Sequence, residues 1–299
     1  MNQNGLPVAM RTYLYDSYTM VLPTYNEQAR VRRVIEYYQA FAPIIVIDNF
    51  SSDSTAEIAR ELGVKVIQYK NPGTIQTPEW MRHIASLVIT DYFLMLSCSE
   101  FIPAALLQKF NEIATKRSAD VVSCVRDSYT CGELIPLWGG KFAAIEARIE
   151  RFFNRKGLDF DKIVIHGHFT PLQENRLLKL PRDRQYVIAH LRDFDAESHI
   201  KKMTEYARVE AQHRKSRERT LTCPKLAELF LREVLRFLHI GPTHWNMISL
   251  REVWARMVMH TLIYWLGWED RSGMTIEHSR EKSRQLWHTL ALSQKDKGC

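Results

Sequence analysis

The sequence is poor in cysteine, and its cysteines are not arranged in pairs. The chain of 299 residues contains five of them, widely scattered and without a CxxC motif. This number and spacing argue against a disulfide framework and against a structural zinc site. The N-terminus lacks a charged segment followed by an apolar run, so no secretory signal is expected. These absences favour a cytoplasmic location.

Long apolar runs are also missing. The uncharged segment at residues 257–268 falls short of the roughly 20 residues that a membrane span needs. The net charge of +7 favours an anionic partner, such as a nucleotide phosphate, an acidic membrane surface or nucleic acid. Nucleic acid is not expected, because the basic residues are spread along the chain and form no known binding motif.

Short apolar runs alternate with amphipathic segments in the first two thirds of the chain, which is typical of an α/β fold. The expected strands are residues 19–22, 44–47, 64–69, 92–96 and 119–126. The expected helices are residues 27–42, 54–63, 79–89, 199–219, 226–240 and 252–268, followed by a frayed polar end after residue 277. We therefore expect a leader at 1–18, an α/β domain at 19–190 and a helical C-terminal region at 191–299.

Polar residues follow the first two expected strands. Residues 23–27 read PTYNE, and residues 48–53 read DNFSSD. Because the ligand crevice of an open α/β sheet lies outside the carboxyl ends of its strands, we expect these two segments to lie side by side and to bind a nucleotide.

These two segments resemble motifs of the family 2 glycosyltransferases, which have the GT-A fold, a Rossmann-like nucleotide-diphospho-sugar transferase domain. The matching residues are Pro23, Tyr25, Asn26, Glu27, Asp48, Ser51, Asp53 and Thr55. A second, looser match places His190, Lys202 and Tyr206 like the His, Lys and Tyr of the branch that includes lipopolysaccharide-core glucosyltransferases. The resemblance implies a role in polysaccharide or lipopolysaccharide biosynthesis.

The resemblance also implies a nucleotide-binding role for the first segment. Thr24, Tyr25 and Glu27 would cradle the nucleoside, and Pro23 and Asn49 belong to the same predicted group.

Asp48 would accept a hydrogen bond from the imide of uracil or thymine, since a carboxylate is an acceptor. In the alternative interpretation Asp48 and Asp53 form a turn and a helix cap, and Tyr25 packs on a neighbour. Arg82 would bind the diphosphate through its planar fork, or it is an ordinary exposed helix residue.

The sequence departs from the family at the expected metal site. Family members usually carry a D-x-D motif there that holds Mg²⁺ or Mn²⁺, whereas this chain has Ser97, Cys98, Ser99 and Glu100. Glu100 alone keeps a carboxylate, so a divalent cation is either weakly bound or dispensed with. We expect the segment to meet the donor diphosphate, with Arg82 or Lys141 as a compensating cation.

The catalytic base is the second departure. The branch presents a Val-His-Glu element, and the matching stretch here keeps His166 but has Gly167 in place of the glutamate. His168 is a candidate base because imidazole titrates near neutrality. Glu174 is a further candidate, and Asp159 and Asp161 are held in reserve. Alternatively, both histidines are structural or bind the acceptor.

Two further features have open interpretations. Residues 138–140 and 151–153 either floor an acceptor cleft or belong to the core, because aromatic faces serve both purposes. The amphipathic segment 226–240 either meets an anionic membrane surface or packs on the catalytic domain.

Together these observations predict an inverting glycosyltransferase. It would move a sugar from a UDP or dTDP donor to a saccharide or lipid-linked glycan acceptor, in the cytoplasm or on the inner face of the membrane. The alternative is a catalytically inactive nucleotide-sugar or glycan-binding protein, because the D-x-D aspartates and the expected glutamate are both absent.

Overall fold

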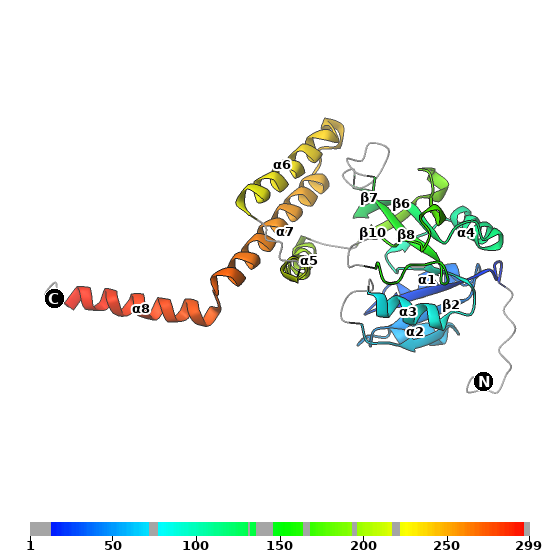
Figure 1. Cartoon of the computed structure of the whole chain (residues 1–299), viewed down its shortest axis with the longest axis horizontal. Coiled ribbons are helices and arrows are strands. Elements are labelled where there is room, and N and C mark those ends of the chain that lie inside the picture. The colour runs from blue at the N-terminus through cyan, green and yellow to red at the C-terminus, as the bar shows by residue number, and fades with distance from the viewer. Residues whose placement is uncertain are drawn as a thin grey trace. The chain divides into compact units, whose positions relative to one another are not determined.

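A computed structural model describes most of the chain. It covers residues 13–71, 77–130, 132–135, 146–163, 168–192, 196–216 and 222–295. The chain divides into two compact units, one formed by residues 1–141 with 145–193 and the other by 142–144 with 194–299. The first is an α/β unit and the second is helical (Figure 1).

Ten strands of the described residues form one sheet in the α/β unit. They are β1 (Tyr18–Thr24), β2 (Ile44–Asp48), β3 (Lys65–Gln68), β4 (Tyr92–Met95), β5 (Glu100–Phe101), β6 (Val121–Thr130), β7 (Glu133–Leu134), β8 (Arg148–Asn154), β9 (Leu177–Lys179) and β10 (Ile188–Arg192). The main order is β3-β2-β1-β4-β8-β6-β10-β5, and β7 and β9 also pair with β6. Strand β8 is antiparallel to both of its neighbours, so β6 runs in the same direction as β4 and β1.

Helices cover both faces of this sheet. They are α1 (Val31–Tyr38), α2 (Thr55–Glu61), α3 (Pro78–Leu87) and α4 (Ala104–Lys116). The apolar residues of α1, α2 and α4 share one core cluster with β1, β2 and β4. Those of α3 belong to a second cluster. Because successive strand residues point to opposite faces, the first four predicted strands supply both clusters.

Strand β8 was not predicted, and it corrects one interpretation of residues 151–153. Phe152 and Phe153 are fully buried in the two core clusters. The Phe152 ring stacks on that of Phe110 with centroids 4.6 Å apart. These aromatic residues therefore belong to the core and do not floor an acceptor cleft. Residues 138–140 and Lys141 lie outside the described residues.

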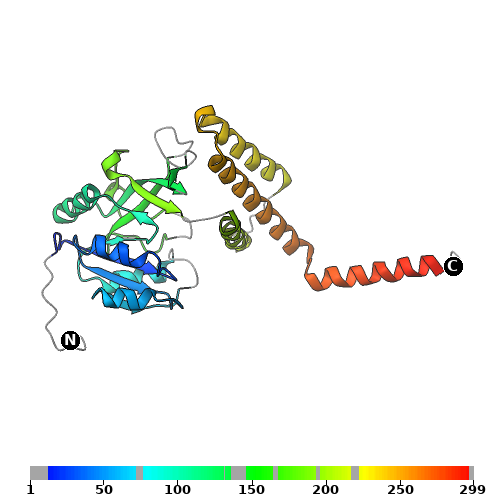
Figure 2. The same ribbon diagram turned by 180° about the vertical axis from the view of Figure 1, so that it is seen from behind.

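The helical unit contains α5 (Ala196–Ser216), α6 (Cys223–His239), α7 (Met247–Ser272) and α8 (Ile276–Lys295), with a short 3-10 helix at Pro242–His244. Both α5 and α6 pack against α7, as seen from behind in Figure 2. The prediction of a frayed end after residue 277 is wrong, because α8 continues the helical structure. None of the described helices is long and apolar enough to span a membrane.

Candidate functional site

The two polar segments after β1 and β2 are joined by hydrogen bonds. The backbone N–H of Asn26 donates to the Ser51 hydroxyl at 2.9 Å, and that of Glu27 donates to the Thr55 hydroxyl at 2.7 Å. Strands β1 and β2 are parallel and in register up to Thr24 and Asp48, so both segments leave the same sheet edge. The prediction that they lie side by side is confirmed.

Asp48 is fully buried beneath these loops. Its carboxylate accepts from the hydroxyls of Thr24 at 3.2 Å and Ser51 at 2.5 Å, and from the Ser51 N–H at 3.1 Å. A carboxylate has about four acceptor positions, so about one remains for a ligand. Asp48 thus forms the turn of the alternative interpretation, and its bond to a nucleobase stays a prediction.

Asp53 stabilises the beginning of α2. Its carboxylate accepts from the N–H groups of Thr55 at 3.0 Å and Gln28 at 3.1 Å, and from the Thr55 hydroxyl. The slight burial of Asp53 would raise its pKa, but these hydrogen bonds outweigh that effect and hold the pKa below its ordinary value. This residue therefore joins the two loops.

Two aromatic side chains are exposed on the joined loops. Tyr25 is 59% exposed and Phe50 is 54% exposed, so neither ring is buried by the residues that the structure describes. Phe50 has a φ of +55°, in the left-handed region that is costly for a bulky residue. Asn49 is less available, because its side-chain amide donates to the carbonyl of Asn71 and accepts from its N–H. Phe50 was missed from the sequence, where only its position beside Asp48 and Asn49 could have indicated it.

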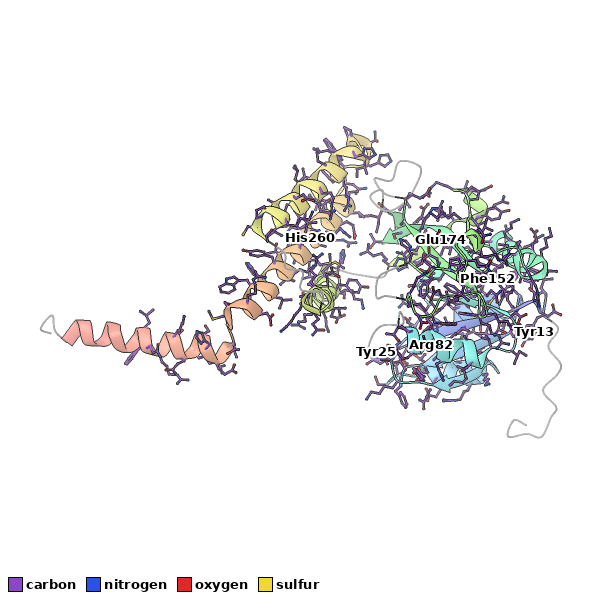
Figure 3. All side chains as sticks on the ribbon, viewed as in Figure 1. Tyr13, Tyr25, Arg82, Phe152, Glu174 and His260 are labelled. Carbon is purple, nitrogen blue, oxygen red and sulfur yellow. The ribbon has the colours of Figure 1, made fainter. Side chains whose placement is uncertain are left out.

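Arg82 lies on α3 and is already paired. Its guanidinium forms an ion pair with Asp161 and lies 5.9 Å from the centre of the Phe160 ring. Figure 3 labels Arg82 and Tyr25 among the side chains of the α/β unit. A diphosphate at Arg82 would compete with Asp161, so the predicted role requires that this exposed pair open.

Glu100 is buried and bound by two arginines. Its Oε2 accepts from Arg151 Nε at 2.7 Å, and its Oε1 accepts from Arg151 Nη2 at 2.8 Å and Arg126 Nη1 at 3.3 Å. Burial alone would raise the Glu100 pKa, but the charge and hydrogen bonds of Arg151, followed by the charge of Arg126, lower it to about 2. The carboxylate is therefore ionised, and three hydrogen bonds from the arginines use about three of its four acceptor positions.

The segment before Glu100 does not fit a divalent cation. The hydroxyls of Ser97 and Ser99 are hydrogen-bonded to each other at 2.9 Å. Burial raises the pKa of the Cys98 thiol to about 12, so it stays protonated. Within the described residues, no cluster of three or more His, Cys, Asp or Glu side chains could hold a metal ion. Hard cations want several oxygen ligands, whereas the predicted metal ligand Glu100 keeps about one acceptor position and already pairs with two guanidinium groups.

Arg151 owes its position to an irregularity in β8. Val122 of β6 pairs with Phe152, whereas the next residue, Ser123, pairs with Glu150, so Arg151 has no partner residue on β6. An extra residue of this kind is a β-bulge, which re-aims side chains. The bulge lets Arg151 bind Glu100 while the neighbouring Glu150 contacts a different group.

That group is His168, a predicted catalytic base. Its Nδ1 lies 3.3 Å from both carboxylate oxygens of Glu150. The side chain of His168 is 75% exposed and that of Glu150 is 6% exposed. A buried carboxylate that contacts one imidazole nitrogen orients the ring and leaves the other nitrogen available. Glu150 was missed from the sequence, because nothing in the basic run around it indicated a buried strand.

The other predicted bases are less well placed. Glu174 lies three residues before Leu177, which pairs with Val121 at the amino end of β6. The catalytic role of Glu174 does not fit the structure, because this edge is opposite to the one that carries Thr24 and Asp48. Asp161 is paired with Arg82. His166 lies outside the described residues.

These features define an α/β protein whose polar ligand edge is formed by two joined loops, with buried charges behind it. The model of the glycosyl transferase family 2 matches residues 19–175, and the chain belongs to this family. The expected GT-A fold with a helical C-terminal region is confirmed, and the protein is a glycosyltransferase.

The individual relatives of this chain share less than a third of their residues with it. Protein RfbJ of Shigella flexneri is 29% identical over 123 residues, which are 38% of this chain and 92% of that protein. The match to the structure of S. aureus TarS 1–349 in complex with UDP-GlcNAc covers 87% of this chain and 93% of that chain, at 11% identity and a TM-score of 0.42. Glucosyl-3-phosphoglycerate synthase from Mycobacterium tuberculosis, in complex with Mn²⁺, UDP and glucosyl-3-phosphoglycerate, covers 61% and 74%, at 16% identity and a TM-score of 0.38.

Proposed function

We propose that this glycosyltransferase is an inverting enzyme that transfers a sugar from a UDP or dTDP donor to a saccharide or lipid-linked glycan acceptor. Polysaccharide or lipopolysaccharide biosynthesis is the process that such an acceptor implies. The observation that carries the inverting mechanism is the contact between His168 and Glu150, because inversion needs a base for the acceptor hydroxyl.

The joined loops hold the nucleoside in this proposal. Exposed Tyr25 stacks on the base. The imide N–H reaches the remaining acceptor position of Asp48 when the loops that bury this carboxylate open. Thr24 and Glu27 shape the same loop through their hydrogen bonds to the second segment. The donor is thereby oriented along the sheet edge, with its sugar directed away from β2.

His168 acts as the base in this mechanism. Its free ring nitrogen takes the proton of the acceptor hydroxyl as that oxygen bonds to the anomeric carbon. The bond between that carbon and the diphosphate breaks at the same time, and its electron pair leaves with the diphosphate. Glu150 accepts the hydrogen bond from Nδ1–H and stabilises the imidazolium that forms.

The test compares His168→Ala and Glu150→Gln in a transfer assay with a panel of UDP- and dTDP-sugars. We expect kcat to fall about 10²- to 10⁴-fold for His168→Ala and less for Glu150→Gln, with UDP affinity unchanged in both. Glu174→Gln is the control, since that residue lies at the amino end of β6. An unchanged rate in His168→Ala would remove it as the base. If the wild type binds UDP but releases none from any donor, the protein is instead a nucleotide-sugar-binding member of the family.

We also propose that the helical unit meets an anionic membrane surface, which places the enzyme on the inner face of the membrane. Exposed apolar residues on α6 and the first part of α7 recur at spacings of three and four. They are Leu231, Leu235, Leu238, Met247, Leu250 and Trp254. Trp245 between the two helices is also exposed. Amphipathic tryptophan and leucine at such positions suit a membrane interface, and a positively charged chain is attracted to acidic lipid.

A further inference from the structure

A cluster of charged and titratable side chains is formed by four strands of the sheet. Its members are Glu100 on β5, Arg126 on β6, Arg151 on β8 and His190 on β10. The segment after β4 crosses to β5, which pairs with β10 so that Glu100 lies opposite His190. Strand β10 pairs in turn with β6, which carries Arg126. The β8 bulge adds Arg151. Elements far apart in the sequence thus bring one carboxylate, two guanidinium groups and one imidazole together.

The cluster carries an excess of positive charge. Arg151 alone satisfies Glu100 through two short hydrogen bonds, whereas Arg126 makes only the longer contact of 3.3 Å. The Nε of Arg126 is buried without a hydrogen-bond partner in the part of the chain that the structure describes. Burial, and next the charge of Arg126, lower the pKa of His190 to about 4, so His190 is neutral at pH 7. One positive charge therefore has no counter-ion inside the cluster.

The hydroxyls of Ser97 and Ser99 lie between this cluster and the nucleotide loops. The N–H of Leu96 donates to the carbonyl of Val21 in β1 at 2.8 Å, and the N–H of Leu191 in β10 donates to the carbonyl of Ser99 at 2.7 Å. The segment therefore runs along the sheet edge from β1 to β10. Because Ser97 and Ser99 share one hydrogen bond, one hydroxyl hydrogen of the pair remains to donate to a ligand.

We propose that Arg126, backed by the Glu100–Arg151 pair and assisted by the Ser97 and Ser99 hydroxyls, holds the donor diphosphate without a divalent cation. This inference rests on the proposed function, and it names Arg126 where the sequence suggested Arg82 or Lys141. Strands β1 and β6 are three strand spacings apart in the sheet, about 14 Å. An extended nucleoside diphosphate whose base lies at Tyr25 bridges such a span.

The guanidinium suits this position chemically. Its planar fork donates two hydrogen bonds to phosphate oxygens and stays protonated throughout. When the anomeric carbon–oxygen bond breaks, the diphosphate gains the electron pair, and a fixed cation stabilises this charge without the reorganisation that water would need. Arg126 is a binding group for the diphosphate, and Arg151 is a positioning residue that keeps Glu100 from neutralising it.

The test measures the binding of UDP and of uridine to the full chain by calorimetry, in MnCl₂ and in EDTA. We expect wild-type UDP affinity to differ by less than about twofold between the two buffers. Arg126→Gln should weaken UDP binding by about tenfold or more in EDTA, the loss expected for charge-assisted hydrogen bonds, and should leave uridine binding unchanged. Arg126→Lys should lose less, because it keeps the charge.

Arg148→Gln is the matched control. The side chain of Arg148 is 23% exposed and that of Arg126 is 26% exposed, but Arg148 is compensated by Glu146 at 2.7 Å. Two results would overturn the proposal. One is a wild-type UDP affinity that rises more than tenfold with Mn²⁺, and the other is an unchanged UDP affinity in Arg126→Gln. If Arg126→Gln does not fold, the wild-type buffer comparison and Arg126→Lys still decide. Failure of the wild type to bind either uridine or UDP would instead refute the proposed function.

Discussion

Replacing Arg151 with glutamine should destabilise the α/β unit strongly. The Glu100 side chain is 1% exposed and that of Arg151 is 9% exposed, so both charges are out of water. Removing Arg151 takes away two hydrogen bonds and leaves the carboxylate with the 3.3 Å contact to Arg126. Breaking a buried pair costs roughly 3–5 kcal/mol, and the remaining contact puts the expectation near the lower end, at about 3 kcal/mol.

Urea unfolding followed by circular dichroism measures this loss. Arg32→Gln is the control, because Arg32 binds Glu61 at 2.9 Å but the two side chains are 48% and 64% exposed. Exposed pairs of this kind contribute about 0–1 kcal/mol. The double variant Glu100→Gln, Arg151→Gln should be more stable than the sum of the single effects predicts, because it leaves no unpaired carboxylate. Equal losses in Arg151→Gln and Arg32→Gln would refute the reasoning from burial.

Two other predictions concern pH and lipid. The folded-state pKa of His190, about 4, lies below its ordinary 6.5, so the unfolded chain binds the proton more readily. The contribution of His190 to the free energy of unfolding should therefore be fully present above pH 6.5 and be lost toward pH 4, by up to about 3 kcal/mol. Urea titrations at several pH values should show a smaller loss in His190→Gln. An equal pH dependence in wild type and variant would contradict the lowered pKa of His190. At low salt, vesicles containing anionic lipid should co-sediment with the wild type but not with the double variant Leu235→Asp, Trp254→Asp. Co-sedimentation of both proteins would show that the exposed apolar residues of α6 and α7 are not the membrane-binding surface.

The nucleotide edge was predictable from sequence because its signals are local. An apolar run that stops at a polar segment marks a strand end, and two such ends around one helix must share an edge of a parallel sheet. The hydrogen bonds between Asn26 and Ser51 and between Glu27 and Thr55 follow from that adjacency. The side-chain partners of Asp48 were harder to predict, since a turn and a ligand contact use the same carboxylate.

The contacts around Glu100, Glu150 and Arg151 depend on pairing between strands that are far apart in the sequence. Such pairing cannot be recognised from a short stretch of residues. Strand β8 carries charged residues at Arg148, Glu150 and Arg151, so its sequence reads as a basic surface segment. Only its pairing with β4 and β6 buries Glu150 and Arg151. The two-residue strand β5 is likewise too short to show a period. The helix α8 is hard to predict for a different reason, because its polar composition is also typical of a frayed chain end.

One physical argument connects the missing D-x-D aspartates with the two arginines beside Glu100, which are Arg126 and Arg151. A single buried carboxylate cannot stay ionised without a counter-ion, because the cost of desolvation would be relieved by protonation. Arg151 supplies that counter-ion to Glu100, and the bulge in β8 makes the contact possible. A second arginine, Arg126, shares the same carboxylate at 3.3 Å, so the cluster holds two guanidinium charges against one carboxylate charge. A metal site produces the same sign of field by placing a doubly charged ion among carboxylates. The residues of this chain can therefore stabilise a leaving diphosphate through Arg126, provided that Arg151 keeps Glu100 engaged.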